Sequence, residues 1–370
     1  SVKTAEDVLD PKQWREWMIE DVITILRTPA KPDGVTPKPP ADMDGSRVFG
    51  DIGWAAMHSA LGDPREDVWA LFKSSRFGSF SHSHADQNTF QLNAYGRALL
   101  IDSGYYPWYG SPHDELWTRQ TRAHNGVLVN GRGQPPFEWA ANGTIERYER
   151  KGALTIVRGQ AAKAYNIPQT DGVLKLWAER LKEPVPPMEP KVETFERTLV
   201  FVSSKTRPVL FIQDYVRTDG PATVDWLLHA LNQMQTDQAA GVIRVRDGDA
   251  RAVVRLISSE RLRFSQTDRF NIEATFGEDP GTAGTEAERK KRYPNQWHLN
   301  ARTEKPASEI RFLAVVVPYR ASEKEPPIES LESAGARGFR VAGSEVTASW
   351  GAGEVRLVVK APDGSTLTSP

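Results

Sequence analysis

The sequence has no cysteine, no apolar run long enough to span a bilayer and no excess of charge of either sign. Without cysteine, a disulfide framework and thiolate chemistry are both excluded. The 47 basic and 48 acidic residues give a net charge of −1, so no overall field favours nucleic acid or an acidic membrane surface. We therefore expect no nucleic-acid partner and no membrane contact, although an anionic polymer could bind at a local basic site.

An alternating rhythm of helices and parallel strands is also missing. From about residue 46, short β-branched or aromatic segments such as "FERTLVFVSS" and "IRFLAVVVPYR" recur between Gly, Asn, Asp or Pro residues. Several of them alternate with period two, as residues 197–202 do. This pattern predicts a mainly β protein built as a large antiparallel β-sandwich, or supersandwich.

The first part of the chain differs from the rest. Over residues 5–28, Trp14, Met18 and Val22 recur every four residues after a candidate N-cap, Asp10, which predicts a helix. A stretch rich in Pro, Asp and Gly follows. We therefore expect a helical segment and linker over residues 1–45 and a β-sandwich domain over residues 46–370.

Histidine is scarce, with seven residues in the chain, yet two lie one residue apart in "SFSHSHADQN", residues 79–88. Neutral imidazole is the commonest metal ligand, and a zinc site needs three or four nitrogen or oxygen ligands. The candidates near His82 and His84 are Asp86, Asp102, His113 and His124.

Chain geometry constrains a metal site at this motif. "FQLNAYGRALLID" predicts a hairpin turning at residues 95–97, and a three-residue loop there would put Asp102 opposite Phe90. If residues 84–90 ran straight, His84 would lie about 20 Å from Asp102. A shared metal therefore requires a bend at residues 85–87, so the hypothesis predicts a loop and not a continuous strand.

The remaining histidines have structural interpretations. We expect His113 to be a hydrogen-bonded loop residue and His229 to point into the core. For His58 and His298 nothing in the sequence suggests a functional role.

Residues 74–134, including "SFSHSHADQNTFQLNAYGRALLIDSG" and "TRAHNGVLVNG", resemble the signature block of the heparinase II/III-like polysaccharide lyases. The resemblance implies an N-terminal α/α toroid, a C-terminal antiparallel β-sandwich and an active site in the cleft between them. This chain matches the sandwich. Residues 5–28 would be the end of the toroid, whose remainder is expected to come from the same precursor or from a separate chain.

The resemblance also implies roles for individual residues. His82 would face the substrate, whereas His84, Asp102 and His124 would bind a structural metal, usually Zn²⁺. The segment "GYYPWYGSPHDELWTRQTR", residues 104–122, adds aromatic rings for sugar stacking and arginines for carboxylates. From it and the histidine motif we expect His82 and Tyr109 to be catalytic. The expected substrate-binding residues are Trp108, Arg119 and Gln87.

The implied activity is β-elimination at a uronic acid within an anionic polysaccharide. We expect alginate or oligoalginate first, and heparin, heparan sulfate or another glycosaminoglycan second. A non-catalytic carbohydrate-binding module with a structural metal is the alternative, and a metal-dependent hydrolase is a weaker third. By resemblance alone, the protein is expected to be bacterial and periplasmic or secreted.

Overall fold

The computed structural model describes residue 40 and residues 43–204, 206–274, 293–351, 353 and 355–369. Contacts divide the chain into Ser1–Asp42 and Met43–Pro370, and the description below concerns the second unit. The helix predicted over residues 5–28 lies outside the described residues. Within the described part, no helix combines the length and apolar character needed to cross a bilayer.

The described chain forms four sheets in which all neighbouring strands pair antiparallel. The first is a five-stranded meander: β1 (Ser46–Phe49), β2 (Trp54–His58), β3 (Val68–Lys73), β4 (Thr89–Ala94) and β5 (Arg97–Leu100). The second has eight strands in the order β12 (Gln235–Asp237), β13 (Val242–Asp247), β14 (Ala250–Ser258), β17 (Ala307–Arg320), β10 (Val209–Ala222), β9 (Val192–Val202), β8 (Leu154–Gln160) and β7 (Thr144–Lys151).

The other two sheets are smaller. The third has the order β15 (Leu262–Thr267), β16 (Trp297–Thr303), β11 (Val224–Ala230) and β6 (Val127–Val129). The fourth is a meander of β18 (Glu329–Ser333), β19 (Ala336–Val341), β20 (Ser344–Ser349), β21 (Leu357–Lys360) and β22 (Thr366–Ser369). The predicted antiparallel β-sandwich class is confirmed.

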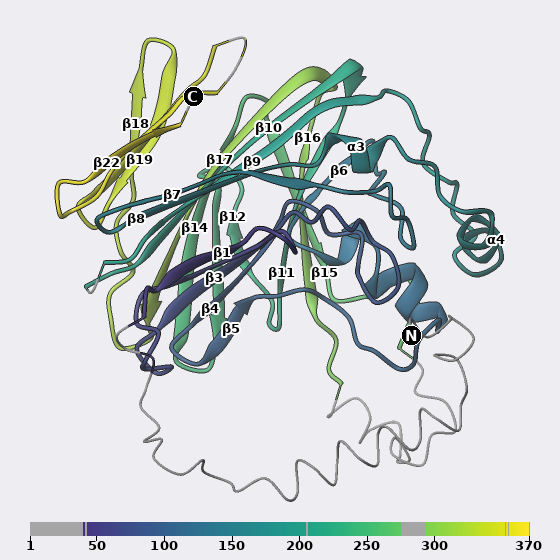
Figure 1. Ribbon diagram of the computed structural model, residues 1–370, viewed down its shortest axis with the longest axis horizontal. Helices are drawn as coiled ribbons and strands as arrows, with labels where there is room; N and C mark the ends of the chain where they lie inside the picture. Colours follow the sequence, from purple (N-terminus) through teal and green to yellow (C-terminus); the bar gives the residue numbers. More distant parts are fainter. Residues whose placement is uncertain are drawn as a thin grey trace, which may run out of the picture. The chain divides into compact units, whose positions relative to one another are not determined.

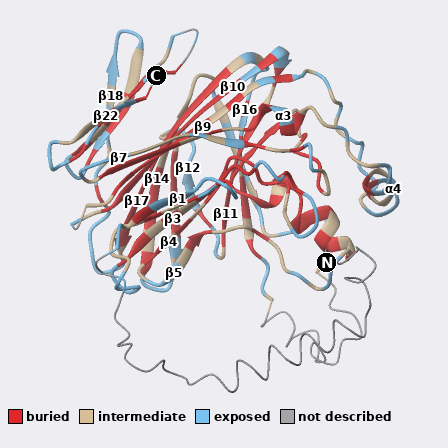
Figure 2. Ribbon diagram, viewed as in Figure 1, coloured by how far each residue is buried: buried red, intermediate tan, exposed pale blue. Residues whose placement is uncertain are grey.

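The inner strands of the eight-stranded sheet are buried on both faces, as their colour in Figure 2 shows, whereas the edge strands β7 and β12 are not buried. In β9, Leu199 and Phe201 join a core shared with the first and third sheets. Val200 and Val202 point the other way, into a core shared with the fourth sheet. The yellow C-terminal strands therefore form an additional layer beside the central sheet (Figure 1).

The hairpin of β4 and β5 has the predicted register, but a two-residue turn followed by a bulge produces it, instead of a three-residue loop. Its turn is Tyr95-Gly96, with φ of 57° and 76°, and Ala94 pairs with Arg97. Positive φ at both central residues is typical of a type I′ turn. The predicted three-residue loop is therefore wrong. A bulge then shifts the register, so that Leu92 pairs with Leu100, as the longer loop would have required.

Helical structure in the described part is confined to short segments between strands. η1 (Asp114–Thr118, a π-helix) and η2 (Thr121–Ala123, a 3₁₀-helix) lie between β5 and β6, ahead of His124. α3 (Ala162–Tyr165) and α4 (Asp171–Arg180) lie between β8 and β9. The Thr170 side chain accepts a hydrogen bond from the Val173 amide and so caps α4.

Candidate active site

The loop between β3 and β4 carries the two neighbouring histidines, and it bends as the metal hypothesis requires. No strand runs through residues 74–88. Ser81 and Asn88 have φ of 56° and 57°, which turns the chain at both ends of the motif. Between them the Ala85 amide donates to the Arg119 carbonyl at 2.8 Å. The predicted bend after His84 is therefore confirmed.

Buried side chains tie this loop to the central sheet. The Asn88 amide donates to the Phe195 carbonyl on β9 at 2.9 Å. Arg197 donates to the carbonyls of Asn88 and Asn125 at 2.8 and 2.5 Å, while its guanidinium pairs with Asp214 at 2.6 Å. Since Asn125 follows His124, one arginine holds both segments that carry the candidate metal ligands.

The two histidines of the motif lie in different environments. His82 is exposed, and its ring centroid lies 4.9 Å from that of Tyr109. His84 is half-buried, and its ring centroid lies 5.2 Å from that of His124, which is fully buried. One ring is therefore open to solvent and the other is directed at a second imidazole.

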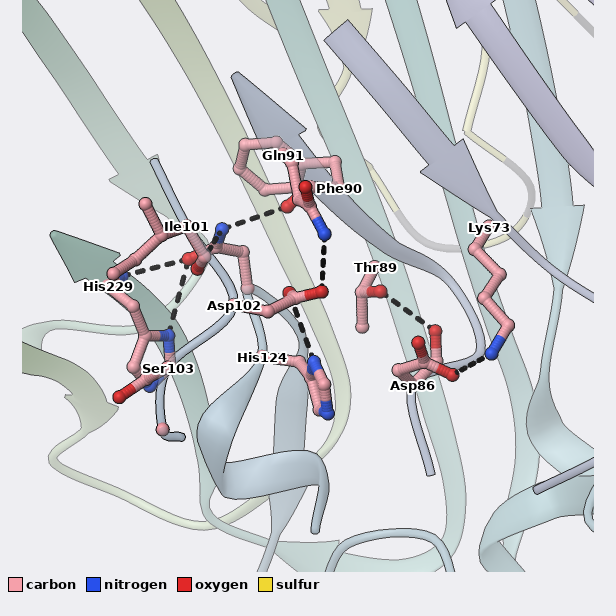
Figure 3. Close-up of polar contacts among 12 residues, drawn as sticks. Lys73, Asp86, Thr89, Phe90, Gln91, Ile101, Asp102, Ser103, His124 and His229 are labelled. Atoms are coloured by element: carbon pink, nitrogen blue, oxygen red, sulfur yellow. Dashed lines mark hydrogen bonds and ion pairs between the residues drawn. The ribbon is translucent and has the colours of Figure 1, made fainter. Parts of the chain in front are cut away.

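Two carboxylates lie close to His84 and His124. One ligand atom each from His84, Asp86 and His124 lie within 4.8 Å of one another. Asp102 Oδ1 lies 3.0 Å from His124 Nδ1, and Gln91 donates to the other Asp102 oxygen (Figure 3). The structure thus brings the predicted ligands Asp102 and His124 into contact. It also adds Asp86, which sequence reasoning named as a candidate but left out of the ligand set.

The carboxylates differ in their remaining partners. Lys73 Nζ pairs with one oxygen of Asp86 (Figure 3), and the two atoms lie 2.5 Å apart. Asp102 Oδ1 and His124 Nδ1 are both buried, and neither makes a hydrogen bond of acceptable geometry, even though they form an ion pair. Buried polar atoms without hydrogen bonds are uncommon, so these two atoms are in place for a further partner.

Electrostatics favours a neutral His84 and a charged Asp102. Burial, reinforced by the nearby His124, lowers the pKa of His84 to about 4, so at neutral pH its ring keeps a lone pair. Burial alone would raise the pKa of Asp102 and lower that of His124. Their mutual attraction outweighs burial in both, so the pKa of Asp102 is lowered and that of His124 is raised.

Tyr109 and Trp108, the predicted cleft residues, are both exposed at the surface, and Tyr109 lies beside His82. Their exposed fractions are 49% and 44%. The Tyr109 ring also contacts Phe137 edge-on, with centroids 6.4 Å apart. The phenol of Tyr109 is therefore accessible next to the exposed imidazole.

Arg119 lies beneath the loop and is not exposed to a ligand: its side chain is 1% exposed. Its Nε pairs with Asp114 at 2.9 Å, and Nη1 donates to the carbonyls of Ser81 and Ser83. Those carbonyls flank His82 in the sequence. The predicted substrate contact is not formed by this buried guanidinium, which instead braces the loop that presents His82.

Gln87, the other predicted substrate-binding residue, is wholly buried. Its side chain accepts from the Ser75 amide at 2.6 Å and donates to the Gly78 carbonyl at 3.1 Å. Its backbone amide donates to Gln134 at 2.9 Å. The structure therefore places Gln87 among the bonds that shape the loop, away from the surface.

The four remaining histidines each form a hydrogen bond or ion pair with a residue other than the candidate metal ligands His84, Asp86, Asp102 and His124. Their structural interpretations predict this. Their partners are the Ile272 carbonyl for His113, the Arg122 carbonyl for His229, Ser103 for His298 and Asp67 for His58.

Comparison with known proteins identifies the family of this chain. Residues 42–331 match the family model described as heparinase II/III-like, C-terminal. Among solved structures, the "Heparinase III-BT4657 gene product" has a TM-score of 0.60 at 15% identity, covering 97% of this chain and 47% of its own. Heparan sulfate lyase HepC from Pedobacter heparinus has the same TM-score and identity, covering 98% and 48%. The chain thus spans about half the length of these structures. No curated protein matches it.

Proposed function

The chain belongs to the heparinase II/III-like C-terminal family, and we propose that it is the β-sandwich part of a polysaccharide lyase acting on uronic-acid-containing polysaccharides by β-elimination. One observation carries the proposal: His82 is an exposed imidazole beside the exposed Tyr109, on a loop braced from below by Arg119. A reactive group on a fixed loop above a buried anchor is suited to catalysis.

β-Elimination needs three kinds of group from the protein: a base, a donor that stabilises negative charge, and an acid. A base removes the proton on C5 of the uronate, charge collects on the adjacent carboxylate, and the bond from C4 to the leaving oxygen breaks as the C4–C5 double bond forms. The leaving oxygen takes a proton. In the proposed roles the His82 ring donates a hydrogen bond to the carboxylate as its charge grows. The Tyr109 hydroxyl takes part in proton transfer.

We assign His84, Asp86, Asp102 and His124 as the ligands of a structural Zn²⁺. Two ligands of a tetrahedral zinc lie about 3.3 Å apart, and the ion-paired Asp102 Oδ1 and His124 Nδ1 are 3.0 Å apart. The neutral His84 ring supplies a third ligand, and Asp86 lies close enough to supply a fourth. When bound, the ion would cross-link the β3–β4 loop to the segment before β6 and so fix His82.

The proposed substrate is a glycosaminoglycan, with heparan sulfate ahead of alginate. Support comes from the neighbouring fold, since one of the two similar structures described above is a heparan sulfate lyase. We propose that the α/α toroid domain expected from the family forms one side of the substrate cleft and that this β-sandwich forms the other. A bacterial periplasmic or secreted location would bring such an enzyme to its substrate.

The test is lyase activity of the full-length protein that contains this chain. Heparan sulfate, heparin and alginate are each incubated with it, and the unsaturated uronate is followed by its ultraviolet absorbance. The His82→Ala variant is expected to lose at least about 100-fold in kcat while it retains zinc. The His84→Ala variant is expected to lose zinc. As a matched control, His113→Gln removes a histidine outside the metal group and is expected to keep it.

Three outcomes would contradict the proposal. Binding of the polysaccharides without an unsaturated product would favour the non-catalytic carbohydrate-binding module. Saturated products whose formation requires the metal would favour a hydrolase. Loss of zinc on His82→Ala would show that the division of roles between the two histidines is wrong.

A further inference from the structure

Three aromatic side chains stand exposed on two loops near His82. Phe77, Phe80 and Trp139 have exposed fractions of 42%, 43% and 55%. The rings of Phe80 and Trp139 stack with centroids 4.4 Å apart and an interplanar angle of 20°, and Phe77 packs edge-on against Trp139 at 6.5 Å. Because aromatic surface is stabilised by burial, a group of three held together at the surface indicates a binding site.

The two loops are joined so that the stack is preformed. The Ser79 amide donates to the Glu138 carbonyl at 2.9 Å, and the Phe137 amide donates to the Ser79 carbonyl at 3.1 Å. Gly78 has φ of 62°, and a Cβ there would lie 2.2 Å from the Glu138 carbonyl oxygen. Only glycine allows this close approach, so the backbone itself is adapted to hold the aromatic rings in place.

The aromatic group is continuous with the candidate active site. Phe80 precedes His82 by two residues, so their Cα atoms lie within about 7 Å. Tyr109 lies between the two loops, with its ring centroid 4.9 Å from that of His82 and 6.4 Å from that of Phe137. Phe137 in turn precedes Trp139 by two residues. Through Tyr109 and these short chain segments, the aromatic group and His82 belong to one continuous surface.

An arginine adds positive charge to the same surface. The Arg76 guanidinium carbon lies 5.3 Å from the centre of the Phe77 ring, and the Arg76 side chain is 61% exposed. Its ion pair with the fully exposed Asp51, at 3.7 Å, is long and open to solvent. A guanidinium beside aromatic rings can bind a carboxylate or sulfate while the rings contact the sugar.

We propose that Phe77, Phe80 and Trp139, with Arg76, form a subsite for an acidic pyranose residue next to the residue that lies at His82. The apolar C–H face of the sugar stacks on Trp139 or Phe80, and the acidic substituent pairs with Arg76. This inference deepens the proposed function and rests on it for the identity of the saccharide.

Binding to the full-length protein tests the subsite without requiring turnover. On a His82→Ala background, calorimetry measures the Kd of heparan sulfate or alginate oligosaccharides, two and six residues long. Trp139→Leu keeps apolar area but removes the aromatic face, and we expect it to raise the Kd of the hexasaccharide about tenfold. Trp139→Phe keeps a face and is expected to stay within about threefold of the parent. The disaccharide, which reaches the subsite from the position at His82, is expected to be weakened by Trp139→Leu in the same way.

Two further variants make the test independent of a single side chain. Phe80→Leu is expected to weaken the hexasaccharide in the same way as Trp139→Leu. Trp350→Leu changes a tryptophan that packs against the core on the other face of the central sheet and is expected to have no effect. An unchanged Kd for Trp139→Leu and Phe80→Leu would overturn the proposal. A Trp139→Phe variant weakened as much as Trp139→Leu would also overturn it, because the aromatic face would then not be what binds the sugar.

The outcomes separate this proposal from the proposed function. If no uronate polymer yields an unsaturated product but hexasaccharide binding depends on Trp139, the subsite stands and the lyase proposal fails. If product forms while both leucine variants bind like the parent, the lyase proposal stands and the subsite fails. A protein partner on this surface would predict that Leu substitutes well for both rings and that oligosaccharide affinity does not change.

Discussion

Replacement of Arg197 by methionine is expected to destabilise the protein strongly, because this buried side chain serves two purposes. Arg197 is fully buried, pairs with Asp214 at 2.6 and 2.8 Å, and donates to two backbone carbonyls, those of Asn88 and Asn125. Removing one partner of a buried ion pair costs about 3–5 kcal/mol. After the substitution, Trp226 would be the donor left to Asp214, at 2.8 Å. We therefore expect Arg197→Met to lower the free energy of unfolding by roughly 4 kcal/mol, out of the ~5–15 kcal/mol typical of a domain.

Urea unfolding of the Arg197→Met and Asp214→Leu variants and of their combination measures the effect. The double variant contains no unpaired buried charge at this position, so it is expected to recover at least about 2 kcal/mol relative to Arg197→Met alone. It is not expected to reach the parent, because the carbonyls of Asn88 and Asn125 still lack their donor. A loss below about 1 kcal/mol for Arg197→Met, or a double variant no more stable than Arg197→Met, would refute this reasoning.

Three further predictions concern pH, backbone geometry and the metal. Burial lowers the pKa of His229 to about 4, against about 6.5 in the unfolded chain, so the stability that this ring contributes is full above pH 6.5 and falls by roughly 3 kcal/mol as the pH drops towards 4. His229→Gln should flatten this part of the curve of unfolding free energy against pH; an unchanged slope would contradict the assignment. Gly78→Ala should lower Tm more than Gly131→Ala, because both glycines have positive φ but an added Cβ meets the Glu138 carbonyl in the first and nothing within 4 Å in the second. If the two variants have equal Tm values, the close approach at Gly78 does not matter. Chelation should lower Tm reversibly, and zinc at 100 times its Kd should restore about 2.7 kcal/mol; a Tm indifferent to zinc would argue against the metal assignment.

The sandwich was predicted from a local signal, whereas the bend was predicted as a condition of the metal hypothesis. Period-two alternation in β9 fixed which side chains share a face, and the structure puts Leu199 and Val200 in different cores. The bend was predicted because a straight chain would separate His84 from Asp102. In contrast, the bulge that sets the register of Leu92 and Leu100 has no local sequence signal of its own, so the turn length was predicted wrongly.

Side-chain direction was harder to predict than position. Arg119 and Gln87 lie in the expected region, but polarity alone does not reveal that their hydrogen-bonding groups turn inward to loop carbonyls and amides. Asp86 joins the metal group because the bend brings it back towards His124, which depends on tertiary structure. The stack of Phe80 and Trp139 joins residues far apart in the sequence, and no periodicity links them.

The anchoring of the β3–β4 loop has a consequence for hydrogen exchange. The amide of Ala85 donates to the Arg119 carbonyl, and that of Gln87 donates to the buried side chain of Gln134. Loops of this length normally exchange their amide protons through small local openings. Here both amides belong to buried residues, and their acceptors lie on neighbouring segments of the chain, so exposing the amides requires those segments to separate from the loop. They should therefore exchange more slowly than the amides of exposed loops, so the anchored part of the β3–β4 loop behaves in hydrogen exchange as part of the folded core.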